Sequence, residues 1–239
     1  MSTATIVIAA TGSNELAKAV ESALAQDHTD TRVWVVIDGP AFTNAVDTVV
    51  APYRNRIQVV QLPENTGANG FYGHRIYAAA SHLINTDYVL YLDQDNWFDN
   101  NHVSTQIAAI ERNDWQWGHS LRKIADKYGN YLCLDDCESL GKWPIYLSNE
   151  HRLVDTSSFC IRRDVVAQIG SVWHWGWGGD RRFLSAISQH FPKWGTTGLY
   201  TLNYRLDGNP NSVNKEFFDT GNSIMYGRYN GEYPWRNTV

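Results

Sequence analysis

Apolar runs that alternate with helical segments constrain this chain more than any other feature of its sequence. Runs rich in Val, Ile and Leu lie at residues 4–10, 32–39, 56–63 and 88–93, and residues 14–26 carry Leu and Val at helical spacing. Strands that are apolar on both faces are typical of a parallel sheet with helices on both sides. The alternation therefore predicts an α/β fold, in which ligands bind beyond the carboxyl ends of the strands.

The second half of the chain has a different pattern. A polar turn at residues 127–130 predicts a hairpin, and a loop rich in Gly and Trp precedes a helix that we expect to begin near Asp180. The sequence has no internal repeat and no clear linker. We therefore expect a single domain over residues 1–239, with a first half at 1–99, a second half at 100–212 and an irregular C-terminal tail at 213–239.

Composition excludes some classes of function. The chain has 239 residues, of which 43% are hydrophobic, and this is enough for a sizeable core. A net charge of −5 argues against binding nucleic acid through the overall field of the protein, although a local groove would still be compatible with it. Such a groove would use the basic side chains of Arg122, Lys123, Arg162, Arg163, Arg181 and Arg182.

Cysteine usage and hydropathy bear on the compartment. The odd number of cysteines favours reduced thiols at Cys133, Cys137 and Cys160. The first two are nevertheless close enough in sequence to close a loop through a disulfide. The apolar run at the N-terminus is too short for a signal peptide or a membrane helix, and no other run approaches the length of a membrane span. We therefore expect a cytoplasmic protein without an integral membrane segment.

Two carboxylates that directly follow an apolar strand are the strongest candidates for chemistry. The run Tyr88–Leu92 leads into Asp93 and Asp95. Alternate residues of an extended segment face the same way, so this pair could hold Mn²⁺ or Mg²⁺ through its carboxylate oxygens. A cation would also neutralise charges that are costly to bury. The alternative is a solvated turn, in which Asp and Asn are common.

Seven segments of the chain together resemble the family-two glycosyltransferases, which have the GT-A fold. The segment YVLYLDQDNWF, at residues 88–98, resembles the Asp-x-Asp motif of that family and the strand before it. The others follow the family's order within residues 4–212, and they read TIVIAATGSNELAKAVESALAQ, VWVVIDGP, ENTGANGFYGHRIYAAA, DTSSFCIRRDVVAQIG, WGWGGDRRFL and YRLDGNPNS. The resemblance implies a single, Rossmann-like GT-A domain with a mostly parallel central sheet flanked by helices.

The resemblance also implies which residues bind the donor. Asp38 ends a strand, where its carboxylate could accept hydrogen bonds from a nucleobase, implied to be uracil; a turn-forming Asp is the alternative. Arg75 is suited to a diphosphate as a planar cation, and an exposed helical arginine is the alternative. The residues implied for the nucleotide sugar are Ala10, Thr11, Asp38, Asn65, Gly67, Arg75, Asp93, Gln94 and Asp95.

The metal ligands implied by the resemblance are Asp93, Asp95 and Asp207. Asp207 departs from the family pattern, because that position usually holds His. A carboxylate there could bind a metal but could not donate a hydrogen bond to phosphate.

Asp180 is the candidate catalytic base. An inverting transfer needs a group that takes the proton from the acceptor hydroxyl, and Asp180 stands at the position of the family's catalytic carboxylate, after Gly178 and Gly179. A carboxylate near a helix N-terminus can also be a simple cap, which is the alternative interpretation.

Three tryptophans precede this carboxylate and are the candidate acceptor wall. Trp173, Trp175 and Trp177 alternate with other residues, so an extended loop would place their indoles on one side, where they could stack on a sugar with Arg181 nearby. Core anchors are the alternative.

The function implied by the resemblance is a metal-dependent, inverting transfer of a sugar from a UDP-sugar to an acceptor hydroxyl. One alternative is an NAD(P)-dependent oxidoreductase, although only Gly12 of the glycine fingerprint follows the first strand. A nucleotidyltransferase and a non-catalytic carbohydrate-binding protein are the others. A glycan or a small hydroxyl compound is the expected acceptor, and a modified nucleic-acid base is less favoured.

Overall fold

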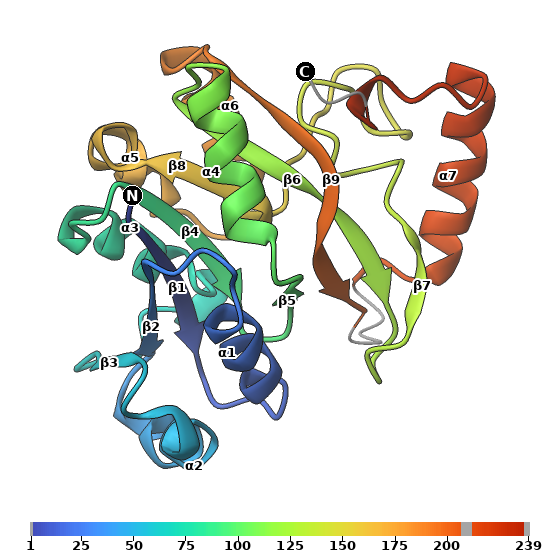
Figure 1. Ribbon diagram of the computed structural model, residues 1–239. Helices are drawn as coiled ribbons and strands as arrows, with labels where there is room; N and C mark the ends of the chain where they lie inside the picture. The colour runs from blue at the N-terminus through green and yellow to red at the C-terminus, as the bar shows by residue number, and fades with distance from the viewer. Residues whose placement is uncertain (1, 207–211, 237–239) are drawn as a thin grey trace.

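The computed structural model describes residues 2–206 and 212–236, and within them the chain forms one α/β domain around a nine-stranded sheet (Figure 1). The strand order is β3-β2-β1-β4-β8-β6-β9-β5, and β7 pairs with β6. The strands are β1 Ala4–Ala10, β2 Thr31–Ile37, β3 Gln58–Gln61, β4 Tyr88–Asp93, β5 Trp97–Phe98, β6 Trp117–Ala125, β7 Tyr131–Leu134, β8 Phe159–Arg162 and β9 Trp194–Arg205.

The strand directions confirm a mostly parallel sheet. β1 to β4 are parallel to one another, and β6 and β9 run the same way. β5, β7 and β8 run in the opposite direction. The expected hairpin around residues 127–130 is the antiparallel pair β6 and β7.

Helices cover both faces of the sheet. α1, α2 and α4 pack on one face, and α3, α5 and α6 pack on the other. The α-helices are α1 Leu16–Leu24, α2 Thr43–Val50, α3 His74–Leu83, α4 His102–Arg112, α5 Arg163–Ile169, α6 Gly179–His190 and α7 Lys215–Tyr229. Short 3₁₀ helices lie at Pro40–Phe42, Ala51–Tyr53, Ala68–Gly70, Thr156–Ser158, Gly170–Trp173 and Pro234–Arg236.

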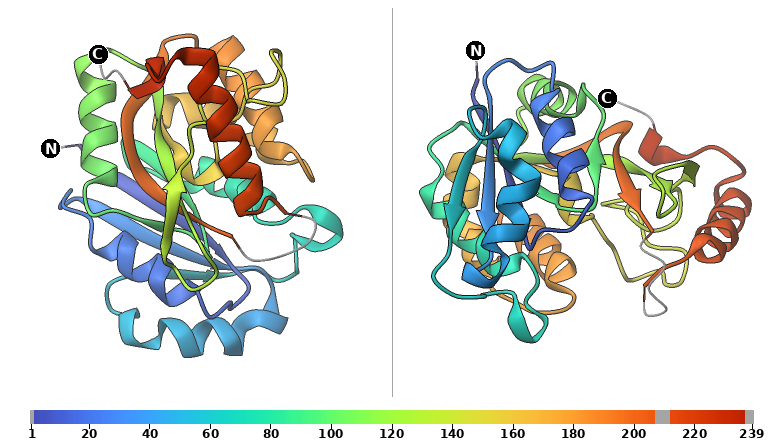
Figure 2. Two further views of the ribbon diagram at one scale, coloured as in Figure 1. Left: turned by 90° about the vertical axis from the view of Figure 1, so that its right-hand side faces the viewer. Right: turned by 90° about the horizontal axis from the view of Figure 1, so that it is seen from below.

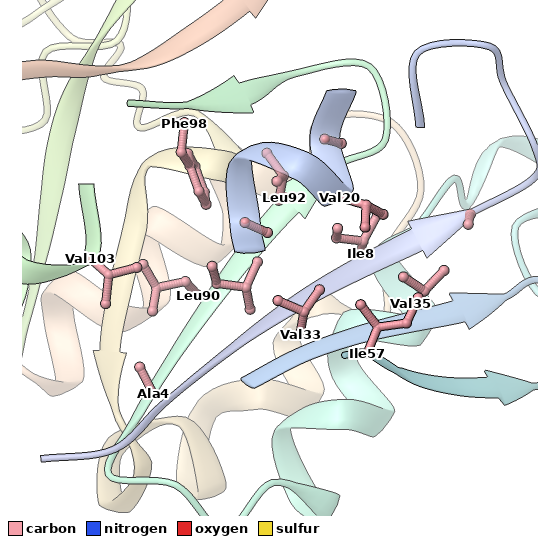
Figure 3. Packing of buried hydrophobic residues seen from close by; sticks show 14 of the residues in the cluster. Ala4, Ile8, Val20, Val33, Val35, Ile57, Leu90, Leu92, Phe98 and Val103 are labelled. Atoms are coloured by element: carbon pink, nitrogen blue, oxygen red, sulfur yellow. The ribbon is translucent and has the colours of Figure 1, made fainter. Parts of the chain in front are cut away.

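The two-residue period of the strands divides the core between these layers. In β4, Leu90 and Leu92 join the cluster on the α1 side, whereas Tyr91 joins the cluster on the α3 side. Figure 3 shows Leu92 close to Ile8 of β1 and Val20 of α1, and Leu90 further along β4 on the side of Val103. Strands buried in this way must be apolar throughout, which explains the uninterrupted runs in the sequence.

The parallel register brings three strand ends to one edge of the sheet. Ala10 of β1 pairs with Ile37 of β2, the residue before Asp38, and Ala9 pairs with Asp93 of β4. The polar residues after each strand therefore lie near one another, as expected for a binding edge.

The C-terminal region corrects one expectation, because residues 213–239 are not an irregular tail throughout. The helix α7 occupies Lys215–Tyr229, and the side chain of Asn214 accepts a hydrogen bond from the backbone N–H of Phe217 at its start. Phe218 and Met225 are buried in a third core cluster with residues of β6. This helix lies on the far side of the molecule from α2 (Figure 2).

Within the described ranges, no helix is both long enough and apolar enough to cross a bilayer. Cys133, Cys137 and Cys160 are free thiols, and the last two are buried.

Candidate active site

A cavity of about 470 Å³ opens where β1, β2 and β4 end. It brings together most of the residues that the sequence assigned to the nucleotide sugar, namely Ala10, Thr11, Asp38, Asn65, Gly67, Asp93, Gln94 and Asp95. Arg75 does not line it. Asp207, the third metal ligand implied by the sequence, lies outside the described residues.

Gln94 fixes the loop after β1. Its Oε1 accepts a hydrogen bond from the backbone N–H of Thr11 at 2.9 Å, and its Nε2 donates to the Thr11 hydroxyl at 2.8 Å. The residue between the two aspartates therefore clamps the neighbouring strand end.

Asp38 is engaged by the loop that follows β3. One carboxylate oxygen accepts from the backbone N–H and the hydroxyl of Thr66, and the other accepts from the backbone N–H of Gly67. Gly67 is required here, because a Cβ would lie 2.3 Å from the Tyr72 carbonyl oxygen. Asp38 thus organises one wall of the cavity as well as lining it.

His74 lines the cavity from the start of α3, where the sequence predicted that Arg75 would do so. His74 begins α3 and lines the cavity, and its Nδ1 lies 2.9 Å from the Trp175 carbonyl oxygen. Since a carbonyl can only accept, Nδ1 carries the proton in this contact. The next residue, Arg75, points elsewhere: its guanidinium stacks on Phe71 at 3.4 Å and contacts the Thr66 carbonyl.

Asp93 is held in a strongly acidic environment. Burial, followed by the charges of Asp155 and Asp95, raises the pKa of Asp93 to about 7. The Tyr77 hydroxyl donates to its Oδ1 at 2.8 Å, and the Ser157 hydroxyl accepts from its backbone N–H. Burial also raises the pKa of Tyr77, so this hydroxyl keeps its proton and remains a donor.

Asp180 lines a smaller adjoining cavity of about 200 Å³. The residues Tyr72, His74 and Thr156 line both cavities. Asp180 lies in the first turn of α6 and accepts from the backbone N–H of Arg181 at 2.8 Å. Burial, opposed by this hydrogen bond, raises the pKa of Asp180. A carboxylate with a raised pKa is a better proton acceptor near neutral pH.

The prediction that three tryptophans form an acceptor wall is wrong for Trp173. Its side chain is 0% exposed and packs in the core, where it stacks on Phe183 with ring centroids 4.1 Å apart. The segment is not extended, because Gly170–Trp173 forms a 3₁₀ helix that turns this indole inward. Trp175 and Trp177 are 47% and 76% exposed, and Trp177 lines the cavity of Asp180.

The basic groove considered from the sequence is also wrong for Arg122. Arg122 is buried, and its guanidinium binds the three carboxylates of Asp135, Glu138 and Asp155. Strand β6 is buried on both faces, so its residue Arg122 points into the protein. Arg162 and Lys123 are paired with Asp164 and Asp99.

Sequence reasoning missed four polar side chains of the two cavities, which are those of Tyr72, His74, Tyr77 and Thr156. Tyr77 follows His74 by three positions and so lies on the same face of α3, but this spacing is a signal only once His74 is recognised. Thr156 lies in the segment DTSSFCIRRDVVAQIG, but nothing in that segment singles it out, because β8, which follows it, reaches this edge only by pairing with β4.

Comparisons with known proteins bear on the family and the fold. The sequence model of the family described as "Glycosyl transferase family 2" matches residues 5–142. No curated protein matches the sequence. Residues 1–349 of S. aureus TarS superpose with a TM-score of 0.66 at 15% identity, covering 96% of this chain and 72% of that chain.

The same TarS fragment has been solved with two ligands. Its complex with UDP gives a TM-score of 0.65 at 16% identity, over 97% of this chain and 72% of that one. Its complex with UDP-GlcNAc gives 0.65 at 17% identity, over 96% and 67%. At these identities the likeness shows a shared fold.

Proposed function

Because this chain belongs to glycosyl transferase family 2 and has the GT-A fold, we propose that it transfers a sugar from a UDP-sugar to an acceptor hydroxyl with inversion. The observation that carries the proposal is the adjacency of the two cavities. Asp93 and Asp95 line the larger one, Asp180 lines the smaller one, and His74 belongs to both. A donor in the first would present its sugar to an acceptor in the second.

The nucleotide of the donor occupies the larger cavity in this proposal. A volume of about 470 Å³ is in the usual range for small-molecule sites. Thr11, Asp38, Asn65 and Gly67 line it from the strand ends. The TarS fragment, which shares the fold, binds UDP and UDP-GlcNAc, and this supports a UDP-sugar here.

A divalent cation, Mn²⁺ or Mg²⁺, fits the electrostatics of this cavity. Burial and the neighbouring charges of Asp155 and Asp95 disfavour the ionised form of Asp93, and a cation would relieve that cost. Within residues 2–206 and 212–236, no group of three or more His, Cys, Asp or Glu side chains is arranged to hold a metal. Asp93 and Asp95 would therefore supply part of the shell and diphosphate oxygens another part, which is the usual arrangement for Mg²⁺. When bound, the cation would neutralise the charge of the leaving diphosphate.

Asp180 is the proposed base. Its carboxylate would take the proton from the acceptor hydroxyl as that oxygen attacks the anomeric carbon. The Arg181 backbone N–H orients the carboxylate, and burial makes it more basic than a surface aspartate. A single displacement without an enzyme nucleophile inverts the anomeric configuration.

Calorimetric titration of UDP with Mn²⁺ and with excess chelator tests the donor site. We expect tighter binding with Mn²⁺, and Asp95→Asn should abolish that difference, whereas Asp114→Asn, an exposed surface change, should retain it. Equal UDP affinity in Mn²⁺ and in chelator would overturn the metal assignment. Hydrolysis of a UDP-sugar by the unaltered protein would exclude a purely carbohydrate-binding role.

A further inference from the structure

A third and larger cavity lies beyond the acceptor side of the site. It measures about 700 Å³ and is formed by the loop at residues 141–152, the outer face of α6 and the start of β9. Arg181 lines this cavity and also the smaller cavity that contains Asp180. A molecule bound in this third cavity could therefore extend toward Asp180, the proposed base.

The cavity is basic, although the chain as a whole is acidic. Its charged lining consists of Lys142, Arg152 and Arg181 against a single carboxylate, Glu150, with His151 beside them. Within the part of the chain that the structure describes, no carboxylate lies within 4.0 Å of the charged nitrogens of Lys142 or Arg152. Arg181 has a partner in Glu138, but at 3.8 Å, and Glu138 already binds Arg122.

Two of these cations are held in place by contacts that leave their charge unneutralised. Arg152 donates from Nε to the Lys142 carbonyl and from Nη1 to the Glu150 carbonyl, so its guanidinium spans the loop. The Lys142 ammonium lies 5.1 Å from the ring centre of Trp194, and burial lowers the pKa of Lys142. Neither charge is paired with a carboxylate in the described structure, so both groups can bind an anion.

The same cavity offers neutral contacts for the rest of such a ligand. The Trp194 indole lines it and is only partly buried. Ser185, Ser188 and Gln189 of α6 also line it.

We infer that this cavity binds an oxyanion of the acceptor, so that the acceptor is a hydroxyl compound that carries a phosphate or a carboxylate. The inference rests on the proposed function, since it takes Asp180 to be the base that the acceptor reaches. The anion would lie among Lys142, Arg152 and Arg181, and the reacting hydroxyl would lie past Arg181, in the smaller cavity.

Matched pairs of small ligands test this inference. Glycerol 3-phosphate is compared with glycerol, and glucuronate with glucose, by chemical-shift titration of the unaltered protein. We expect at least one anion to bind more tightly than its neutral partner, and the tighter anion identifies phosphate or carboxylate as the group recognised. Binding should weaken at least several-fold when NaCl rises from about 50 mM to about 500 mM, because the contact is between exposed charges.

Variants then locate the binding. The double change Lys142→Gln with Arg152→Gln should weaken binding of the anion at least fivefold, whereas Lys215→Gln, a paired surface lysine on α7, should not. Neutral ligands that bind as tightly as the anions, or full affinity in the double variant, would overturn the inference. Preferential binding of an RNA oligonucleotide over the small anions would also overturn it.

Failure of the proposed function has a different signature. In that case the unaltered protein would neither bind UDP nor hydrolyse a UDP-sugar, whatever the result with the anions. If UDP-sugar hydrolysis occurs without anion binding, only the inference about the acceptor is wrong.

Discussion

Asp180 is the residue whose replacement most directly tests the proposed chemistry. Asp180→Asn keeps the size of the side chain but cannot take a proton, so sugar transfer should fall by roughly two to four orders of magnitude. UDP affinity should stay nearly constant, because Asp180 lines the cavity of about 200 Å³ and not the cavity of about 470 Å³ that is proposed to hold the nucleotide. Turnover and UDP affinity are measured on the same preparation.

If Asp180 acted only on the helix dipole at the start of α6, this variant would lose at most about 1 kcal/mol of stability and transfer would stay nearly intact. In the parent, transfer should decline as pH falls through the raised pKa of Asp180, since the base must be ionised. A product with retained anomeric configuration would contradict the single displacement.

Asp38 illustrates how a site residue can also be structural. Its carboxylate binds Thr66 and Gly67, so Asp38→Ala leaves their partly buried donors without an acceptor. We expect the free energy of unfolding to fall by about 1–3 kcal/mol, together with weaker UDP binding. Asn65→Ala, which removes only a contact with the Ala68 backbone, should cost less stability. Denaturant melts in the absence of UDP make the comparison, and an unchanged midpoint for Asp38→Ala would show that these contacts contribute nothing.

Residues at strand ends could be predicted from the sequence because an apolar strand that ends in a carboxylate is a local pattern. Asp38, Asp93 and Asp95 were found in this way and line the cavity. The choice between His74 and Arg75 could not be made, because neighbouring helical residues point about 100° apart and the direction depends on where α3 packs.

At the scale of elements, the Trp loop before α6 divides into a core part and an exposed part. Trp173→Ala would leave a large cavity beside Phe183 and should cost about 3–5 kcal/mol of stability. Trp177→Ala should change stability by no more than about 0.5 kcal/mol, because its side chain is mostly exposed. Urea melts of the two variants measure the difference. Equal losses of stability would mean that both indoles are structural.

The elements that sequence reasoning predicted least well are those with weak periodicity. The strands β1, β2 and β4 were evident because both of their faces are buried. By contrast, α7 buries only a narrow face that includes Phe218 and Met225, and the polar and aromatic residues around that face resemble a loop. Its cluster draws on Leu121 and Ile124 of β6, which lie far away in sequence.

At the scale of the whole molecule, the buried charge cluster of Arg122 links strand β6 with the segment that leads to β8. Asp155 accepts from Arg122 through one carboxylate oxygen and caps the 3₁₀ turn before β8 through the other. The same Asp155 is among the charges that raise the pKa of Asp93 and of Asp180. No local pattern predicts such a cluster, because its partners come from distant segments.

Removing this cation should therefore destabilise the whole fold. Arg122→Met keeps much of the volume of the side chain but leaves Asp135, Glu138 and Asp155 buried without their partner. The expected loss is about 3–5 kcal/mol of unfolding free energy at neutral pH. Arg54→Met, which breaks a surface pair with Asp47, should cost at most about 1 kcal/mol.

The pH dependence of this loss gives the sharper test. In the parent, burial would raise the pKa of Asp135, but Arg122 and backbone donors lower that pKa overall. The ionised Asp135 therefore stabilises the fold above the pKa that Asp135 has in the unfolded chain, and this stabilisation is lost as pH falls. Without Arg122, burial dominates and the carboxylates favour their protonated forms in the folded state. The variant then loses stability as pH rises above the carboxylate pKa values of the unfolded chain. The difference in unfolding free energy between the parent and the variant should therefore be small near pH 4 and largest near pH 7. Denaturant melts across this range, on both proteins, measure the deficit. A deficit that is independent of pH would show that Arg122 contributes by packing and not by its charge.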